Sequence, residues 1–459
     1  MFKPEKFRNK TAAVLGAGKS GICCANLLVK NGFAVILSEE KKLLSRKLKE
    51  KTALLNSAVL FETGGHSEKI FKAGFAVKSP GIFNHSPIIK ELKQRKIPVF
   101  SEVETALSLS KCKNILAMTG TNGKTTTTVL LGEIMRMTGG KVRVCGNIGT
   151  PVSQIADKAG KNDCIVMEIS SYQLEDSSYF HPRISGILNI TPDHIDHHRS
   201  MENYIKAKTK IFTDQEPGDY CIFNHADAFC LEMSKNCPSG KLFFSSSSTW
   251  KGLNAAFENG KILVNFKSVK KSIAPPKLPG THNIENAMAA ALMALAAGAK
   301  FCDVEAAFAG FKGVEHRIEE AGTIKEIRFI NDSKATNVDS TLIALKALGR
   351  TRNIWLILGG LDKGSPYAPL APFIRNYVKA VLTIGSAAHK IEKELKGTSA
   401  IMSSKTLKKA VETAYKKASR GDVILLSPAC ASFDQFSDFE DRGRQFKQIV
   451  SSLKKICHS

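Results

Sequence analysis

A glycine-rich segment between an apolar strand and a helix is the feature that most constrains this chain. After the apolar residues 115–118, the sequence 119–126 reads TGTNGKTT and continues as a helical pattern over 127–137. Glycines allow backbone N–H groups to turn towards phosphate oxygens, and the N-terminus of a helix favours an anion. A lysine adds a positive charge, and a threonine hydroxyl can bind Mg²⁺. The segment therefore predicts a loop that binds the phosphates of a nucleotide, within an α/β domain.

The spacing of this loop departs from the usual G-x-x-x-x-G-K-[ST]. Met118 stands where the first glycine is expected, and Gly120 is an additional glycine. An ordinary strand-to-helix turn is the alternative, since short motifs also occur without a ligand. The residues expected at the nucleotide are Gly120, Thr121, Asn122, Gly123, Lys124, Thr125 and Thr126.

Length and composition are those of a globular protein with several domains. At roughly 150 residues per domain, the 459 residues suggest about three domains. The content of 43% hydrophobic and 24% charged residues allows each domain a core. The longest apolar run, 287–299, is well short of the roughly 20 residues that span a bilayer, so we expect no membrane insertion. Residues 1–10 hold no apolar segment typical of a secretory signal, which favours a cytoplasmic protein.

A formal net charge of +24 raises nucleic-acid binding as a hypothesis. The basic residues are spread along the whole chain, and clusters such as Lys41–Lys51 are interrupted at helical spacing, which is typical of a solvated helix face. We therefore predict no nucleic-acid partner, and small polyanionic substrates also suit a basic protein. The 11 cysteines include no C-x-x-C pair, so a zinc or disulfide framework is not expected.

The N-terminal region carries a second glycine motif. Residues 16–21 read GAGKSG, between an apolar strand at 11–15 and a helix at 22–30. A second strand, 33–37, is followed by an acidic segment about 20 positions after the glycines, where a ribose hydroxyl can be held. These residues alone predict a dinucleotide, and a Rossmann-like scaffold that binds no NAD is the alternative. Further strands at 75–78 and 98–100 extend the β/α alternation.

Two strand ends follow the phosphate loop. The strand 141–145 leads to a tight turn containing Asn147, a candidate ligand contact. The strand 164–167 delivers Glu168 at its carboxyl end, where open α/β sheets bind ligands. A carboxylate there can complete a Mg²⁺ site begun by Thr125, and a plain surface acid is an equal alternative.

A histidine-rich loop follows the expected strand 184–190. The sequence 191–198 reads TPDHIDHH, which suits either a metal site or a polar loop, and the H-x-x-H-H spacing matches no closed zinc site. Ser200 then caps a helix. Lys208 lies on the apolar face of that helix, whereas Lys206 and Lys210 point elsewhere. A buried lysine needs a functional reason unless its ammonium reaches solvent along the surface.

The last third of the chain alternates strand and helix again. Strands at 327–330, 354–358, 381–384 and 423–426 all end in polar or glycine-rich turns. A parallel sheet presents a binding crevice in this way.

Together these segments resemble the Mur ligases of peptidoglycan synthesis over essentially the whole chain. The most specific signatures are residues 120–125 (GTNGKT), His282-Asn283, His316-Arg317, residues 331–337 (NDSKATN) and residues 427–436 (SPACASFDQF). The last stretch resembles the branch of the family that adds D-glutamate rather than the branch that adds diaminopimelate or lysine.

The resemblance implies an α/β protein of three domains. They are a Rossmann-like N-terminal domain that holds UDP rather than NAD (1–103), a central P-loop ATPase domain with a mostly parallel sheet (104–313), and a Rossmann-like C-terminal domain that binds the amino acid and closes on ATP (314–459). The implied contacts of the UDP-sugar are Lys19, Ser20, Ser38, Glu39, Glu40, Gly81, Asn147 and His194. Family members often carry Asp in the segment 38–40, and this sequence departs from that pattern.

By the same resemblance, the adenine, ribose and phosphates of ATP are also contacted by Asn283, Asn286, Arg317 and Asp332. Thr125 and Glu168 would hold one Mg²⁺ ion, and His194 with Lys208 a second. A CO₂-derived carbamate on Lys208 would turn the buried cation into a carboxylate-like ligand. The implied catalytic residues are Lys124, His194, Lys208 and Lys334.

The implied reaction joins D-glutamate to UDP-N-acetylmuramoyl-L-alanine through an acyl phosphate made with ATP, by a monomer. The residues that would hold D-glutamate are Thr336, Lys363, Ser432 and Phe439. A related ligase that adds a different amino acid is the alternative. A folylpolyglutamate-type ligase is a further one, although it lacks the N-terminal domain present here. No side chain is an obvious base for the incoming amine.

Overall fold

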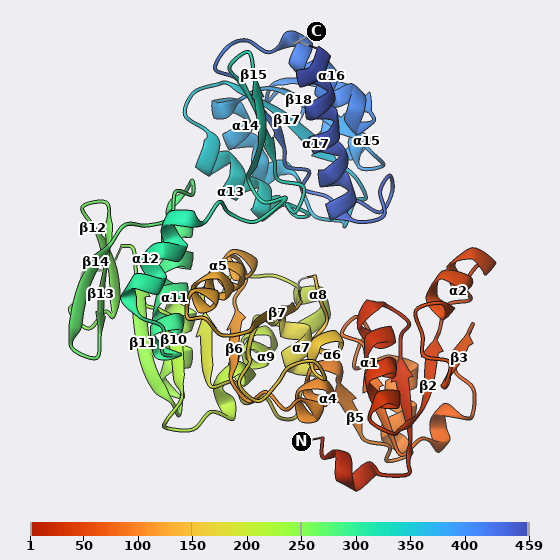
Figure 1. Ribbon diagram of the computed structural model, residues 1–459. Helices are drawn as coiled ribbons and strands as arrows, with labels where there is room; N and C mark the ends of the chain where they lie inside the picture. The colour runs from red at the N-terminus through yellow and green to blue at the C-terminus, as the bar shows by residue number, and fades with distance from the viewer. Residues whose placement is uncertain (1, 148, 248–249, 457–459) are drawn as a thin grey trace. The chain divides into compact units, whose positions relative to one another are not determined.

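The computed structural model describes residues 2–147, 149–247 and 250–456, which form two compact units. The first unit comprises 1–277 and 281–311, and the second comprises 278–280 and 312–459. Each unit is built from mostly parallel sheets with helices on their faces (Figure 1). Because strands covered on both faces must be apolar throughout, this architecture explains the continuous apolar runs at the strand positions. The predicted α/β fold is confirmed.

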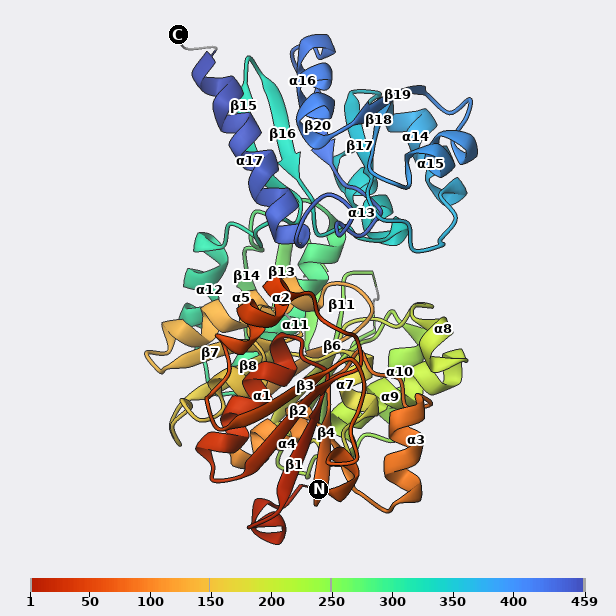
Figure 2. The ribbon, with the colours of Figure 1, turned by 90° about the vertical axis from the view of Figure 1, so that its right-hand side faces the viewer.

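The first sheet has five parallel strands in the order β3-β2-β1-β4-β5. Figure 2 shows α1 and α3 on opposite sides of this sheet. Ile22 and Leu28 of α1 pack on one face, and Ile88 and Leu92 of α3 pack on the other. The elements are η1 (Pro4–Phe7), β1 (Thr11–Leu15), α1 (Lys19–Lys30), β2 (Ala34–Glu39), α2 (Ser45–Thr52), β3 (Val59–Thr63), η2 (Ile70–Lys72), β4 (Phe75–Lys78), α3 (Pro87–Gln94), β5 (Val99–Ser101) and α4 (Glu102–Leu109).

The second sheet has nine strands in the order β14-β13-β12-β11-β10-β9-β6-β8-β7, and only the β12-β13-β14 edge is antiparallel. Its strands are β6 (Ile115–Thr119), β7 (Val142–Gly146), β8 (Cys164–Glu168), β9 (Ile184–Ile187), β10 (Tyr220–Asn224), β11 (Gly240–Ser245), β12 (Ala255–Glu258), β13 (Lys261–Phe266) and β14 (Val269–Ile273). Its helices are α5 (Lys124–Met137), α6 (Val152–Ile155), α7 (Ser171–Glu175), α8 (Ile195–His198), α9 (Met201–Thr213), α10 (Ala228–Lys235), α11 (Thr281–Ala296) and α12 (Phe301–Gly310).

The third sheet forms the second unit and has the strand order β15-β16-β20-β17-β18-β19. Helices α13 to α15 pack on one face and α16 with α17 on the other. The elements are β15 (Glu319–Ile324), β16 (Ile327–Asn331), α13 (Val338–Leu348), β17 (Ile354–Gly359), η3 (Ala368–Leu370), α14 (Ala371–Tyr377), β18 (Val378–Ile384), α15 (Ala388–Glu394), β19 (Ala400–Lys405), α16 (Leu407–Lys417), β20 (Val423–Leu426) and α17 (Phe439–Ile456).

Several predicted elements have different bounds in the structure, and two of these differences lie at the glycine motifs. The helix expected from Ile22 begins at Lys19, because the extended Gly18 serves as its N-cap residue. The strand expected over 184–190 ends at Ile187, because the following residues leave the sheet and bond to the phosphate loop. No helix in the described part of the chain is both long and apolar enough to cross a membrane.

Candidate active site

The phosphate loop connects β6 to α5. Gly123, at the N-cap of α5, has φ +86°, a left-handed conformation that favours glycine. A Cβ atom at this position would lie 2.2 Å from Asn286 Oδ1 on α11. The glycine therefore allows the loop and Asn286, two of the expected ATP contacts, to lie against each other.

The side chain of Lys124 folds over this loop. Its Nζ donates to the carbonyl oxygens of Gly120 and Thr121, at 2.9 and 2.8 Å. The loop is fixed on the other side by Asn189, which accepts from Asn122 N at 2.8 Å and donates to Asn122 O at 3.1 Å. Sequence reasoning missed Asn189, although an amide side chain at the end of an apolar run was a signal for such a contact.

The predicted Mg²⁺ ligands Thr125 and Glu168 are in direct contact. Thr125 Oγ1 donates to Glu168 Oε2 at 2.8 Å, and Asn147 Nδ2 donates to Glu168 Oε1 at 2.8 Å. Glu168 is 2% exposed. Glu168 ends β8, Asn147 directly follows β7, and Thr125 lies in α5, the helix after β6. The three strands are adjacent in the sheet, so these residues meet at its carboxyl edge. A buried carboxylate beside a hydroxyl is a donor set that suits Mg²⁺.

Lys208 lies on the buried side of α9, as the helical spacing predicts. It is 1% exposed, and its Nζ donates to Gly120 O at 2.8 Å, with Thr119 Oγ1 at 3.4 Å. Burial lowers the pKa of Lys208 well below its ordinary value, and the nearby charge of Lys124 lowers the pKa further. Burial therefore favours the neutral amine of Lys208 more than that of an exposed lysine.

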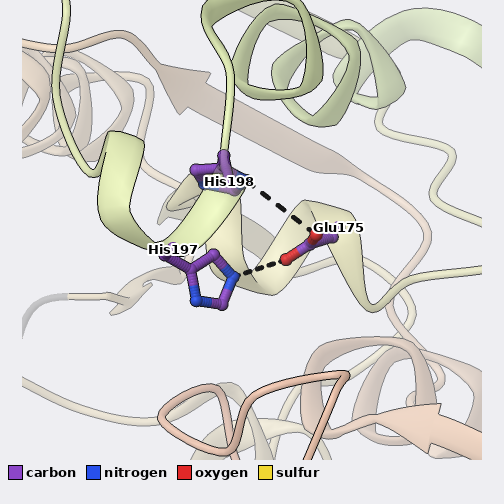
Figure 3. A group of neighbouring side chains, drawn as sticks. All are labelled: Glu175, His197 and His198. Atoms are coloured by element: carbon purple, nitrogen blue, oxygen red, sulfur yellow. Dashed lines mark hydrogen bonds and ion pairs between the residues drawn. The ribbon is translucent and has the colours of Figure 1, made fainter.

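His194 lies apart from the other two histidines of its loop. It is the N-cap residue of α8 with φ +54°, its side chain is 47% exposed, and its ring centroid is 5.0 Å from that of Tyr172. Partial burial lowers the pKa of His194. The structure instead brings His197 and His198 to Glu175 (Figure 3). The His-rich segment thus divides into two groups.

Lys19 and Ser20 open α1 directly after the first glycine turn. The Lys19 ammonium donates to the carbonyl oxygen of Gly149, in the turn after β7. A Cβ at Gly21 would lie 1.9 Å from Gly16 O, so glycine is required where α1 approaches the turn. The structure thereby brings the N-terminal glycine motif to the turn that follows β7.

The end of β2 supports the same glycine turn. Glu39 Oε2 accepts a hydrogen bond from Ala17 N at 2.9 Å. Ser38 is fully buried, and its hydroxyl donates to Glu62 Oε1 at 2.8 Å. Ser38 and Glu39 therefore stabilise the protein's own backbone and side chains at this position. The remaining expected contacts, Glu40 and Gly81, are exposed.

In the second unit, Asp332 is buried at the end of β16. Its Oδ2 accepts from Ser427 Oγ at 2.7 Å, and its Oδ1 accepts from Ile318 N at 3.2 Å. Burial raises the pKa of Asp332 to about 7, and Ser427 and Arg317 oppose that shift. A carboxyl group with this pKa titrates near neutral pH.

The expected D-glutamate contacts follow adjacent strands of the third sheet. Thr336 follows β16, Ser432 follows β20 and Lys363 follows β17, and these three strands are neighbours. Phe439 begins α17, and the Nζ of Lys334 lies 5.5 Å from the centre of its ring. The carboxyl ends of these parallel strands therefore gather most of the expected residues at one edge of the sheet.

Arg442 was not predicted, although it organises this edge. It is fully buried, and it donates from Nε to Ser333 Oγ at 2.9 Å and from Nη1 to Cys430 O at 3.2 Å. Burial lowers its pKa to about 10. The signal was its spacing, because Arg442, Phe446 and Val450 recur at the interval of one helical stripe.

Comparisons with known proteins agree with this architecture. Residues 118–294 match the Mur ligase middle domain, and residues 316–430 match the Mur ligase glutamate ligase domain. The chain is 50% identical over 460 residues to the UDP-N-acetylmuramoylalanine--D-glutamate ligase of Elusimicrobium minutum (strain Pei191), covering 99% of this chain and 100% of that protein. It is 42% identical over 450 residues to the ligase of the same name from Koribacter versatilis (strain Ellin345), covering 97% of this chain and 98% of the relative.

A solved structure shares the fold at lower identity. UDP-N-acetylmuramate-alanine ligase MurC from Thermotoga maritima has a TM-score of 0.63 and is 19% identical, covering 97% of this chain and 100% of that chain. The fold agrees with that structure, and the two domain matches are those of a ligase. The chain belongs to the Mur ligase family.

Proposed function

We propose that this protein is an ATP-dependent ligase that joins D-glutamate to UDP-N-acetylmuramoyl-L-alanine. The observation that carries the proposal is 50% identity to a ligase of that name over 99% of this chain. Mur ligases use ATP and Mg²⁺, and the phosphate loop with its buried Glu168 supports the same use here. The nucleotide-linked substrates and ATP support a cytoplasmic location, and we propose a monomeric enzyme.

We assign one role to each of the three sheets. The first sheet and its helices, within 1–103, are the UDP-sugar domain. The nine-stranded sheet, within 104–313, is the ATPase domain. The third sheet, within 314–459, is the amino-acid domain. The strand orders support three sheet-based domains, because no sheet exchanges a strand with another among the described residues. The boundary at 103/104 falls within α4.

The chemistry that this assignment requires has two steps. A carboxylate oxygen of UDP-N-acetylmuramoyl-L-alanine attacks the γ-phosphorus of ATP, the bond to the bridging oxygen breaks, and ADP leaves. The amine of D-glutamate then attacks the carbonyl carbon of the acyl phosphate, loses a proton, and expels inorganic phosphate. Negative charge on the transferred group is the main barrier, so positioning and electrostatics supply most of the acceleration.

Two lysines are assigned to this charge. Lys124 Nζ, which now donates to the carbonyls of Gly120 and Thr121, would turn to the β- and γ-phosphates. Lys334, on the segment after β16, would contact the transferred phosphoryl group. The remaining loop residues would supply backbone N–H groups to the phosphates. The other contacts of the adenine, ribose and phosphates are assigned to Asn283, Asn286, Arg317 and Asp332.

Thr125 and Glu168 would hold one Mg²⁺ ion, and His194 with a carbamate of Lys208 a second. Bound Mg²⁺ offsets phosphate charge and orients the oxygens. The donor set fits a hard cation, because Thr125 Oγ1 and Glu168 Oε2 are 2.8 Å apart and buried. Carbamate formation needs a neutral amine, which attacks CO₂ and releases one proton. The lowered pKa of Lys208 supports that step.

The N-terminal site is assigned to UDP rather than NAD. Glu39 already accepts from Ala17 N, so its Oε2 is used by the glycine turn. Lys19, Ser20, Glu40, Gly81, Asn147 and His194 are the assigned substrate contacts, and Ser38 and Glu39 are assigned a supporting role. Thr336, Lys363, Ser432 and Phe439 are assigned to the carboxylates of D-glutamate.

An isotope experiment tests the proposed chemistry. UDP-N-acetylmuramoyl-L-alanine labelled with ¹⁸O in its carboxylate is incubated with ATP, Mg²⁺ and D-glutamate. One labelled oxygen should appear in inorganic phosphate, and the product mass should equal both substrates joined with loss of water. Release of unlabelled phosphate with no joined product would refute the ligase assignment.

A further inference from the structure

Glu175, His197 and His198 form a cluster that the proposed reaction does not use (Figure 3). Glu175 is the last residue of α7, and the two histidines end α8. One donor atom from each residue lies within 4.8 Å of the other two. We propose that this cluster binds one divalent transition-metal ion of the zinc type, separate from the Mg²⁺ of the reaction.

His198 is prepared as a neutral donor. Its ring is fully buried, and Nε2 lies 2.9 Å from Ser171 Oγ. Nδ1 has no hydrogen-bond partner among the described residues, and the nearest carboxylate atom, Glu175 Oε1, is 3.9 Å away. A proton on Nδ1 would be too far from that oxygen for a hydrogen bond. The proton therefore belongs on Nε2, where Ser171 accepts it, and the Nδ1 lone pair faces the carboxylate.

Two electron-pair donors facing each other at this distance suit a cation between them. Metal–ligand distances of about 2.0 to 2.2 Å give a separation of roughly 3.4 Å between two ligands of a tetrahedral zinc ion. The observed 3.9 Å from His198 Nδ1 to Glu175 Oε1 is slightly wide, and the 2.6 Å from His197 Nε2 to Glu175 Oε2 is slightly short. A rotation of the Glu175 carboxylate, which is 30% exposed, would bring both separations towards that value.

His197 can join the site without losing a hydrogen bond at its far nitrogen. Its side chain is 4% exposed, and Nδ1 has no partner among the described residues. Coordination through Nε2 would leave the ring proton on Nδ1, where no existing hydrogen bond is broken. The direct hydrogen bond between His197 Nε2 and Glu175 Oε2 would then be replaced by coordination of both atoms to the same metal ion.

The outer side of the cluster opens into a cavity of about 400 Å³ that Arg199, Lys206 and Lys210 also line. These positive charges weaken cation binding and raise an anion as the rival occupant. Lys210 Nζ already donates to Glu175 O at 2.7 Å and Ser177 O at 3.0 Å, while Arg199 and Lys206 are exposed. An anion would have to lie beside the Glu175 carboxylate and two nitrogens, so the geometry favours the metal ion.

The bound ion would act as a positioning site. It would join the end of α7 to α8, directly after His194. The ring of Tyr172 on α7 links the two groups, since its centroid is 4.1 Å from that of His197 and 5.0 Å from that of His194. Metal binding would therefore hold the loop that carries His194.

The test uses the full chain with Cys302→Ser and Cys457→Ser, stripped of metal and kept free of ATP and Mg²⁺. Cys302 is the exposed thiol among the described cysteines, and Cys457 lies outside the described residues. Zn²⁺ binding is measured by competition with a chromogenic chelator, and Co²⁺ binding by visible absorption. One ion should bind per chain, with a Co²⁺ spectrum that lacks thiolate charge transfer. Glu175→Gln and His198→Asn should each weaken Zn²⁺ binding by at least about tenfold, a loss typical of a disrupted metal site.

His181→Asn is the matched control. His181 Nε2 lies 2.7 Å from Asp219 Oδ2, a contact of the same kind that no third His, Cys, Asp or Glu joins among the described residues, so Zn²⁺ affinity should be unchanged. Glu175 is partly exposed, so its variant should retain the circular dichroism and metal-free melting temperature of the parent. No Zn²⁺ binding by the parent, equal binding by Glu175→Gln, or a thiolate Co²⁺ spectrum would overturn the proposal. Phosphate binding that Lys206→Ala abolishes, without Co²⁺ binding, would assign the cavity to an anion and overturn it as well.

Discussion

Lys124 and Lys208 donate to the same backbone oxygen. Their Nζ atoms lie 2.9 and 2.8 Å from Gly120 O. Two ammonium groups this close repel each other, and Lys208 is 1% exposed, so water cannot stabilise its charge. Burial and the Lys124 charge together lower the pKa of Lys208. The charge of Lys124 therefore acts in the same direction as burial and favours the neutral amine of Lys208, the form that the proposed carbamate would need.

Lys208→Ala should reduce ligase activity at least about a hundredfold, the size of effect seen when one group that stabilises transition-state charge is removed. Added acetate should restore part of the activity, because a short carboxylate can occupy the position of the carbamate. Product formation is measured with and without acetate, and circular dichroism checks the fold.

Lys206→Ala is the control for that variant, because Lys206 is exposed on the opposite side of α9 and should keep near-normal activity. Lys210→Ala is a poorer control than the sequence suggests. Its ammonium donates to Glu175 O and Ser177 O, so the variant should lower the melting temperature. Normal activity of Lys208→Ala in bicarbonate-free buffer would contradict the assigned role.

Gly123→Ala should weaken ATP binding by at least about tenfold. The new Cβ would lie 2.2 Å from Asn286 Oδ1, so the loop or α11 must move. Gly139→Ala is the matched control, since Gly139 also has a positive φ, +84°, but a Cβ added there would meet no atom within 4 Å. Both variants should lose roughly 1–2 kcal/mol to backbone strain. Calorimetric titration with a non-hydrolysable ATP analogue should show a defect in Gly123→Ala alone, and equal affinities would refute the clash.

Asp332 should make the second unit less stable as the pH rises. Its pKa of about 7 in the folded state is above the ordinary 3.8, so the folded state holds the extra proton between these values. The free energy of unfolding should fall from about pH 4 to about pH 7, by roughly 4 kcal/mol at most. Asp332→Asn should remove that part of the slope. Denaturant titrations across this range measure it, and identical slopes in both proteins would show that Asp332 is ionised throughout.

A buried ion pair links the first sheet to the second. Lys78 Nζ, at the end of β4, lies 2.7 Å from Asp176 Oδ2, directly after α7, and the two side chains are 1% and 3% exposed. Lys78→Met should lower the free energy of unfolding by about 3 kcal/mol, because it leaves a buried carboxylate without its partner. The double variant Lys78→Met, Asp176→Leu should recover part of that loss. Chemical denaturation measures both, and a double variant as unstable as the single one would contradict this interpretation.

Local patterns in the sequence predict the fold well. Apolar runs predict the central strands, whereas edge strands with more polar sequences, such as β15 and β19, were not predicted. The spacing of Tyr204, Ile211 and Phe212 places Lys208 on the buried side of α9, where it is 1% exposed. The glycine at position 123 predicts a tight loop conformation that residues with a side chain rarely adopt. Its φ of +86° agrees with that prediction. These features depend on neighbours a few residues away, so they can be read from sequence.

Pairings between distant segments could not be read in this way. Asn189 bonds to Asn122, and Lys78 to Asp176, across separations that no local pattern encodes. The first pairing also shortens the predicted strand to Ile187. The histidine-rich loop shows the same limit, because its spacing alone does not reveal that His197 and His198 turn to Glu175.

The most direct test of the assigned function is ADP release with UDP-N-acetylmuramoyl-L-alanine, ATP and Mg²⁺ against a panel of amino acids. D-glutamate should be required, and NAD should have no effect. L-glutamate tests the handedness of the site, while L-lysine and diaminopimelate test the other branches of the family. ADP release that depends on D-glutamate alone is the predicted result. Equal or faster release with L-glutamate, L-lysine or diaminopimelate would contradict the account.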